Sequence, residues 1–260
     1  MKGLLDLKSF FITVLIASLS WGQLNPANRK IVGKDDFRMV NAQATNIPFK
    51  YKLVPEAIGL ISMGCTGTHL GQGVVLTAGH CFDAAKVKFN KSCEGVQVFW
   101  GVREGKNPTS VSTCKKLLVI EDTKNKDYAL FIVDKPPRIS LPIRLNSKPE
   151  LSTRVTIFSH PFKQPLMWSG VCEIRKSFAA RYSNSTDTGY LQMSLGLIHH
   201  QCDTNPGSSG AAILDAETAE VIGIHNGGVS EGPTGYNYGT YITSTYIPEI
   251  LKRIGYIFPK

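Results

Sequence analysis

Short apolar runs, each bounded by glycine, proline, asparagine or serine, recur along most of the chain and constrain its fold more than any other feature. They are rich in valine, isoleucine and aromatic residues, a composition typical of β-strands. The runs are Ile58–Ile61, Gly73–Leu76, Val96–Trp100, Leu117–Ile120, Tyr128–Val133, Val155–Phe158, Tyr190–Leu195, Ala211–Leu214 and Val221–Ile224. Closely spaced strands of this kind indicate a β-barrel or β-sandwich. We therefore predict an all-β fold.

A helical period is found near the C-terminus. Ile247, Ile250, Leu251 and Ile254 follow helical spacing, and Pro248 is tolerable in a first turn. We expect one amphipathic helix there. The stretch Lys135-Pro136-Pro137-Arg138 is typical of a connector. It predicts two strand-rich halves that divide near residues 135–150, with any site shared by both halves in the cleft between them.

The N-terminus differs from the rest of the chain. Lys2 and Lys8 precede an apolar stretch, Phe10–Leu19, and small residues follow it. This pattern predicts a secretory signal peptide over residues 1–22, because the apolar stretch is too short to span a bilayer. We expect a secreted protein, extracellular or periplasmic, that does not associate with membranes once the signal is removed.

Cysteine usage agrees with export. The chain has six cysteines: Cys65, Cys81, Cys93, Cys114, Cys172 and Cys202. An even set in an exported chain predicts three disulfides, although spacing does not fix how they pair. A Cys65–Cys81 bridge is attractive because it would clamp the loop that carries His80. No Cys-x-x-Cys or His-x-x-x-His spacing supports zinc, and we expect neither a metal nor a cofactor.

The chain carries a formal net charge of +9, but its basic residues are scattered singly. No Lys/Arg run interleaves with aromatic residues as in proteins that bind nucleic acids. We interpret the charge as a solvated basic surface and expect no nucleic-acid partner.

Two separate motifs carry chemistry. In Gly207-Ser208-Ser209-Gly210, glycine lets the backbone turn sharply, so that amide N–H groups can point at one spot beside Ser209. Such donors form an oxyanion hole, which is among the largest contributions to acyl-transfer catalysis. In Thr77-Ala78-Gly79-His80-Cys81, His80 supplies the base that a serine hydroxyl needs to act as a nucleophile.

A carboxylate should orient the imidazole and stabilise its protonated form. Asp127 is the best candidate because it immediately precedes the apolar run Tyr128–Val133, which can bury and fix its side chain. Asp83, Asp122 and Asp134 are alternatives with weaker context.

The three motifs, completed by Asp127-Tyr128-Ala129-Leu130, resemble those of the chymotrypsin-like serine peptidases, and their order His, Asp, Ser is the order of that group. The resemblance covers roughly residues 55–255. It implies a double six-stranded β-barrel with a C-terminal α-helix, a peptidase domain over residues 31–260, and protein or peptide substrates cleaved by a monomer. It also implies that His80 is the base, Asp127 the orienting acid and Ser209 the nucleophile, with the amides of Gly207 and Ser209 as the oxyanion hole.

Within that group, the chain is most similar to the bacterial glutamyl endopeptidases. Ser208 stands where trypsin has an aspartate, and Val221–Gly228 resembles the strand that carries the pocket histidine of this branch. The resemblance assigns His225 and Thr204 to a pocket for a substrate carboxylate, which implies cleavage after Glu or Asp. Asp203 favours the opposite specificity, because it falls where trypsin-like enzymes place the acid that selects Arg or Lys. Trypsin-like cleavage set by Asp203 is therefore the alternative specificity.

The stretch Arg29-Lys30-Ile31-Val32-Gly33 resembles a tryptic activation site. It implies a candidate propeptide over residues 23–30, removed by an activating protease at Lys30, whereas the alternative is an exposed basic linker. A catalytically silent homologue that binds peptides is the alternative to an enzyme; such proteins typically lose a triad residue, and none is missing. We assign no role to His160, His199 or His200.

Overall fold

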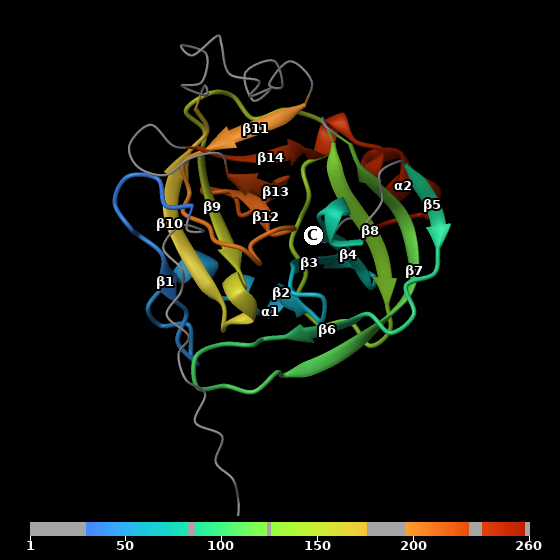
Figure 1. The fold of residues 1–260 in the computed structure, drawn as a ribbon, viewed down its shortest axis with the longest axis horizontal. Coiled ribbons are helices and arrows are strands. Elements are labelled where there is room, and N and C mark those ends of the chain that lie inside the picture. Colours follow the sequence, from blue (N-terminus) through green and yellow to red (C-terminus); the bar gives the residue numbers. More distant parts are fainter. Residues whose placement is uncertain (1–29, 83–86, 124–125, 176–195, 229–235, 258–260) are drawn as a thin grey trace, which may run out of the picture.

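The computed structural model describes residues 30–82, 87–123, 126–175, 196–228 and 236–257. The predicted signal peptide, most of the candidate propeptide and the predicted strand Tyr190–Leu195 lie outside these residues, as does Asp83. The described strands form two antiparallel sheets that lie side by side (Figure 1). No helix among the described residues is long and apolar enough to cross a membrane.

The first sheet is a six-stranded barrel with one added strand. Its strands are β2 (Ile58–Ile61), β3 (Thr66–Gly71), β4 (Val74–Thr77), β5 (Lys88–Lys91), β6 (Gln97–Trp100), β7 (Ser110–Asp122) and β8 (Asp127–Val133). The order is β7-β6-β2-β3-β4-β8, and β8 pairs back to β7, which closes the ring. Strand β5 is added to β7.

The second sheet repeats this plan. Its strands are β1 (Arg38–Met39), β9 (Arg154–Ser159), β10 (Met167–Glu173), β11 (Leu197–His200), β12 (Ala212–Asp215), β13 (Val221–Gly228) and β14 (Asn237–Tyr241). The order is β10-β9-β12-β13-β14-β11, and a bridge between Ile174 and His200 joins its two ends. Strand β1 is added to β10. The predicted double six-stranded barrel is therefore confirmed.

The helices are short. Within the described residues, two are α-helices, α1 (Val54–Ala57) and α2 (Ile247–Arg253), and four are 3-10 turns: η2 (Phe49–Tyr51), η3 (Gly79–Phe82), η4 (Pro161–Lys163) and η7 (Ile242–Ser244). Helix α2 confirms the predicted C-terminal helix, with Pro248 in its first turn. Ile254 lies just beyond the helix and is partly exposed, so it does not extend the apolar face as expected.

The largest apolar cluster joins the two barrels. It includes Leu130 of the first barrel, Phe158 and Leu214 of the second, and Ile247 and Leu251 of α2. Each barrel also has its own core, built around Trp100 and Phe131 in the first and Ile157 and Ile213 in the second. Because burial of apolar area is the dominant favourable contribution to folding, the shared cluster fixes how the barrels lie against each other.

Three disulfides tie the loops to the barrels, as the cysteine count predicts. They join Cys65 to Cys81, Cys93 to Cys114, and Cys172 to Cys202. The first confirms the expected clamp on the segment that carries His80. Two histidines, His80 and His200, lie next to paired cysteines in a grouping that resembles a metal site. Because these cysteines are bonded to each other, they offer no thiolate to a metal.

The segment between β8 and β9, residues 134–153, contains no described strand. The predicted division near 135–150 falls within it. Its backbone is held at both barrels, since the N–H of Leu141 donates to the carbonyl of His69 and that of Arg144 donates to the carbonyl of Val221. The loops that carry the predicted site residues meet where the barrels face each other.

Candidate active site

His80 and Asp127 form a closely joined pair. Turn η3, which carries His80, follows β4, and β4 pairs with β8, which begins at Asp127. The backbone N–H of His80 donates to Asp127 Oδ1 (2.9 Å), and His80 Nδ1 lies 2.6 Å from Asp127 Oδ2. An ionised carboxylate only accepts hydrogen bonds, so Nδ1 carries the proton and Nε2 keeps a lone pair. The pair therefore has the tautomer that a general base requires.

The second barrel holds Asp127 in place. The side-chain amide of Asn226 donates to the carbonyl of Asp127 (2.7 Å), and the N–H of Asp127 donates to Thr240 Oγ1 (3.2 Å). Thr240 Oγ1 in turn donates to Asn226 Oδ1 (2.9 Å). Sequence reasoning missed Asn226 and Thr240, because a single polar residue in a strand carries no motif. They bind the acid of one barrel to strands β13 and β14 of the other.

The pKa of His80 reflects two opposing causes. Burial lowers the pKa, but the hydrogen bond and negative charge of Asp127, with the charge of Asp122, together raise it above the ordinary value. The side chain of His80 is 37% exposed and that of Asp127 is 16% exposed, so water reaches the histidine more than the acid. The carboxylate thus favours the protonated imidazole that forms when a base accepts a proton.

Ser209 lies in the loop between β11 and β12, against the segment that leads to His80. Its carbonyl accepts the N–H of Thr66 (2.9 Å), and Gly210 donates its N–H to the carbonyl of His225. Gly210 has a φ of +84°, and a side chain there would lie 2.1 Å from Thr77 Oγ1. Only glycine permits the loop to approach β4 this closely. Ser209 is thereby brought to the barrel interface.

The amides of Gly207 and Ser209 are oriented by the carbonyls that share their peptide planes. The carbonyl of Pro206 accepts from the N–H of Phe162 (2.6 Å), and that of Ser208 accepts from the N–H of Ala211 (3.0 Å). In a trans peptide the N–H points away from the C=O. The N–H groups of Gly207 and Ser209 therefore point away from these anchors, and neither has an acceptor among the described residues.

His225 is buried on β13 and contacts a second histidine. His200 Nε2 lies 3.2 Å from His225 Nδ1, a contact that sequence reasoning did not predict because β11 and β13 are far apart in the chain. Burial, together with the charge of His80, lowers the pKa of His225 to about 3. Burial also lowers the pKa of His200 well below its ordinary value, aided by the neighbouring His225 and His199. Both rings are neutral at neutral pH, so the N–H of one ring donates a hydrogen bond to the unprotonated nitrogen of the other. His199 instead packs against Tyr236, with ring centroids 4.8 Å apart.

Thr204 lies beside the N-terminal segment. Its backbone exchanges two hydrogen bonds with Lys30, at 3.1 and 3.2 Å, and the side chain of Asn237 donates to the carbonyl of Lys30 (3.0 Å). The hydroxyl of Thr204 is buried and has no hydrogen-bond partner among the described residues. A buried hydroxyl without a partner is rare in folded proteins and calls for an explanation.

Asp203 is buried and its carboxylate is already engaged. Oδ1 accepts the N–H of Val32 (2.8 Å) and Oδ2 accepts the N–H of Asp36 (2.8 Å). Burial raises the pKa of Asp203 to about 6, against the effect of these two hydrogen bonds. Spacing from Ser209 did not indicate this contact, because the segment that supplies the donors precedes Asp203 by about 170 residues. Two alternatives to Asp127 as the orienting acid are described. Asp134 accepts from the backbone N–H of Thr113 and pairs with Lys115. Asp122 lies opposite Asp127 on β7, and its charge raises the pKa of His80.

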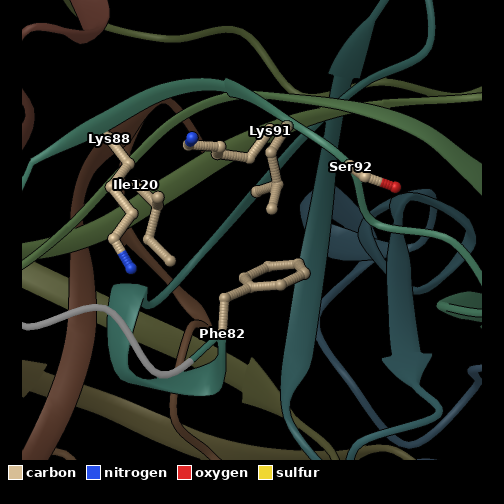
Figure 2. Close-up of a pocket in the computed structure, with 6 residues that line it drawn as sticks. Phe82, Lys88, Lys91, Ser92 and Ile120 are labelled. Atoms are coloured by element: carbon tan, nitrogen blue, oxygen red, sulfur yellow. The ribbon is translucent and has the colours of Figure 1, made fainter.

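A cavity of about 330 Å³ lies beside η3, on the first barrel. Figure 2 shows the ring of Phe82 below it and the side chains of Lys88 and Lys91 above it. None of the predicted specificity residues lines this cavity. It is therefore separate from the residues around His225 and Thr204.

Comparisons with known proteins agree with this geometry. Residues 65–224 match the family model of a trypsin-like peptidase domain. Among solved structures, the chain is similar to a Glu endopeptidase in complex with MPD, with a TM-score of 0.60 and 19% identity; the match covers 86% of this chain and 98% of that one. At this identity the likeness shows the fold, which is chymotrypsin-like. The chain has no match among curated proteins. Since the family match spans most of the chain and includes all three motifs, the chain belongs to the trypsin-like peptidase family.

Proposed function

We propose that this chain is a serine endopeptidase that works through an acyl-enzyme. The observation that carries the proposal is the double hydrogen bond from His80 to Asp127, which sets the tautomer of the imidazole. His80 Nε2 takes the proton of the Ser209 hydroxyl as its oxygen attacks the peptide carbonyl. The negative charge that develops on the carbonyl oxygen is stabilised by the N–H groups of Gly207 and Ser209.

The second half of the reaction uses the same groups. His80 gives its proton to the departing amine, which leaves the substrate's acyl group on Ser209. Water, deprotonated by His80, then releases the acyl group by a second attack. Asp127 stays ionised throughout and stabilises the imidazolium. No metal or cofactor is required by these steps.

Hydrolysis of an activated peptide ester by the secreted protein tests the proposal. Ser209→Ala removes the nucleophile, and Ser92→Ala, at an exposed serine elsewhere on the first barrel, is the matched control. We expect Ser209→Ala to lose turnover by several powers of ten and Ser92→Ala to match wild type. A wild-type protein that folds, has its N-terminus cleaved and still hydrolyses no ester would favour the silent peptide-binding homologue.

We also propose cleavage after Glu or Asp. The buried, unpartnered hydroxyl of Thr204 is a donor that a substrate carboxylate would satisfy. If His200 Nε2 donates to His225 Nδ1, the proton of His225 lies on Nε2, where it is available to the same carboxylate. Against Arg or Lys specificity, both oxygens of Asp203 already accept backbone N–H groups of Val32 and Asp36, which directs the carboxylate toward the N-terminal segment.

Substrates that differ only in the residue before the cleaved bond test the specificity. With glutamate there, we expect Thr204→Val and His225→Ala each to reduce kcat/KM by about 10- to 100-fold, the effect of losing a hydrogen bond to a charged group. Thr204→Ser keeps the hydroxyl and should stay near wild type. Cleavage after Lys or Arg that is lost in Asp203→Asn would establish the trypsin-like alternative.

We propose that cleavage after Lys30 activates the enzyme. Lys30 occupies the backbone N–H of Thr204 and the side-chain amide of Asn237, beside the proposed carboxylate site. Its removal frees both donors for a substrate carboxylate. It also creates an ammonium at Ile31, adjacent to Val32, whose N–H binds Asp203. The positive charge then lies close to the proposed pocket.

N-terminal sequencing of the active secreted protein tests this step, with Ile31 as the expected first residue. Lys30→Gln should block cleavage and activity, whereas Lys34→Gln, at an exposed lysine of the same segment, should not. Full activity of a protein that still begins at Gln23 would show that residues 23–30 are a basic linker rather than a propeptide.

We also propose that the protein is secreted. Three disulfides support export to an oxidising compartment, in agreement with the predicted signal peptide.

A further inference from the structure

The side chain of Thr66 connects three segments of the molecule. Thr66 begins β3 and is fully buried. Its hydroxyl donates to the carbonyl of Gly207 (2.9 Å) and accepts the N–H of His160 (2.9 Å). One hydroxyl thus joins a strand of the first barrel, the turn before η4 and the loop of Ser209.

Three consecutive backbone carbonyls, those of Pro206, Gly207 and Ser208, each accept a hydrogen bond. Phe162 holds the carbonyl of Pro206 and Ala211 holds that of Ser208. Thr66 holds the carbonyl between them. The same peptide is also held at its other end, because the N–H of Ser208 donates to the carbonyl of Asn205 (2.9 Å). Glycine has wide conformational freedom, so without the Thr66 hydrogen bond this peptide would be free to rotate about the Asn205 contact. Such a rotation would turn the neighbouring N–H groups away from a common point.

The turn at His160 is built to fit this loop closely. Gly207 has a φ of +97°, and a side chain there would lie 2.7 Å from the carbonyl oxygen of His160 and 2.8 Å from the nitrogen of Phe162. Phe162 adopts a left-handed conformation, with φ 52° and ψ 29°, that is costly for a bulky residue. His160 Nδ1 lies 3.0 Å from the carbonyl of Gln164, which closes the turn. A strained residue persists where its surroundings fix it, and here its N–H binds the carbonyl of Pro206.

We infer that Thr66 is a positioning residue for the oxyanion hole. Its hydroxyl ties the Gly207 carbonyl to the His160 turn, and this tie keeps the N–H groups of Gly207 and Ser209 directed at the developing oxyanion. The inference rests on the proposed serine peptidase activity. Thr66 acts through the Ser209 loop and does not itself touch the substrate. Its effect is therefore on turnover rather than on substrate binding.

A set of isosteric variants tests the inference. Thr66→Val removes the hydroxyl and keeps the shape, while Thr66→Ser keeps the hydroxyl. The matched control is Thr68→Val, because Thr68 is a fully buried threonine on the same strand whose hydroxyl has no hydrogen-bond partner among the described residues. Thr66→Ala gives the same comparison should the valine variant not fold.

Kinetics and active-site titration together distinguish a misplaced oxyanion hole from a loss of correctly folded protein. A fluorophosphonate counts the competent serines at its end point and reports oxyanion stabilisation by its rate. We expect Thr66→Val to be labelled to the wild-type extent but more slowly, with kcat about 10- to 100-fold lower, somewhat less than the loss of a whole oxyanion donor. KM should change by less than about twofold, since ground-state binding is not involved. Thr66→Ser and Thr68→Val should stay close to wild type.

The inference is wrong if Thr66→Val retains kcat, if Thr66→Ser is equally impaired, or if lost activity matches a lost fraction of labelled protein. In each of these cases the wild-type enzyme is still labelled, so the proposed activity stands. A wild-type protein that is not labelled at Ser209 overturns the proposed activity and the role of Thr66 together.

Discussion

Asp127→Asn is the substitution that most sharply perturbs the proposed base. The carboxylate accepts two hydrogen bonds from His80, one from the backbone and one from Nδ1 at 2.6 Å. An asparagine has one acceptor oxygen, so its NH₂ group must face either the backbone N–H or the imidazole. When it faces the imidazole, Nδ1 becomes the acceptor and the proton moves to Nε2. The base then has no lone pair for Ser209.

The magnitude follows from the charge and the tautomer. At about 4 Å and an effective dielectric constant of about 20, the attraction between imidazolium and carboxylate is about 4 kcal/mol. This corresponds to about three powers of ten in rate, because each 1.36 kcal/mol is about tenfold. The wrong tautomer adds to this loss. We therefore expect kcat/KM to fall by about 10⁴-fold, the size known for the same change in a triad of this type.

The pH dependence gives an independent check. A base works in its neutral form, so activity is lost as the pH falls through the pKa of His80. Asp127 raises that pKa, and its charge is absent in Asp127→Asn. The acid limb of the profile should therefore move to lower pH. Circular dichroism and thermal unfolding verify that the variant is folded. A folded variant within tenfold of wild-type kcat/KM would refute the reasoning.

Three further predictions follow from buried contacts. Gly207→Ala should reduce kcat by at least about 100-fold, because its Cβ would press on His160 and Phe162 and displace the Gly207 N–H, a proposed oxyanion donor; unchanged ester turnover contradicts this. Cys65→Ser with Cys81→Ser should lower the free energy of unfolding by about 3 kcal/mol, measured by denaturant titration, since a loop of sequence separation 16 is released; an unchanged midpoint contradicts it. Asp203 has a pKa raised to about 6, so the folded state binds its proton more tightly than the unfolded state and this contribution to stability is lost as the pH rises toward that value. The stability of wild type relative to Asp203→Asn should therefore decrease as the pH rises from the ordinary pKa of an aspartate to about 6, and a pH-independent difference over this range contradicts the expectation.

The strands that sequence analysis predicted are those with a continuous apolar run. Ile58–Ile61 coincides with β2, and Tyr128–Val133 lies within β8. Strand β3, by contrast, has the sequence TGTHLG and was missed although all six of its residues are buried. Two of its buried polar side chains bind other segments: Thr66 donates to the Gly207 carbonyl, and His69 Nδ1 lies 2.8 Å from the carbonyl of Ile139. Such partners are far away in sequence and leave no local pattern.

In the candidate site, too, some residues could be predicted from the sequence and others could not. His80, Asp127 and Ser209 stand in recognisable motifs, because the backbone of each needs a particular local sequence. The residues that support them do not. Asn226 of β13 donates to the carbonyl of Asp127 in the other barrel, and His200 of β11 lies against His225 of β13. Both contacts join strands that come together only in the folded chain. The resemblance placed Asp203 where trypsin-like enzymes have the acid that selects Arg or Lys, whereas its hydrogen bonds to Val32 and Asp36 emerge only in the folded chain.

Covalent labelling of Ser209 tests the central proposal most directly. The mature secreted protein is treated with a fluorophosphonate, and the labelled residue is located by peptide mapping. The proposed triad predicts one label per molecule on Ser209, with labelling strongly slowed in His80→Ala, which removes the base. No label on Ser209 in folded, mature protein, or labelling that is unaffected by His80→Ala, would contradict the proposal that this chain is a serine peptidase.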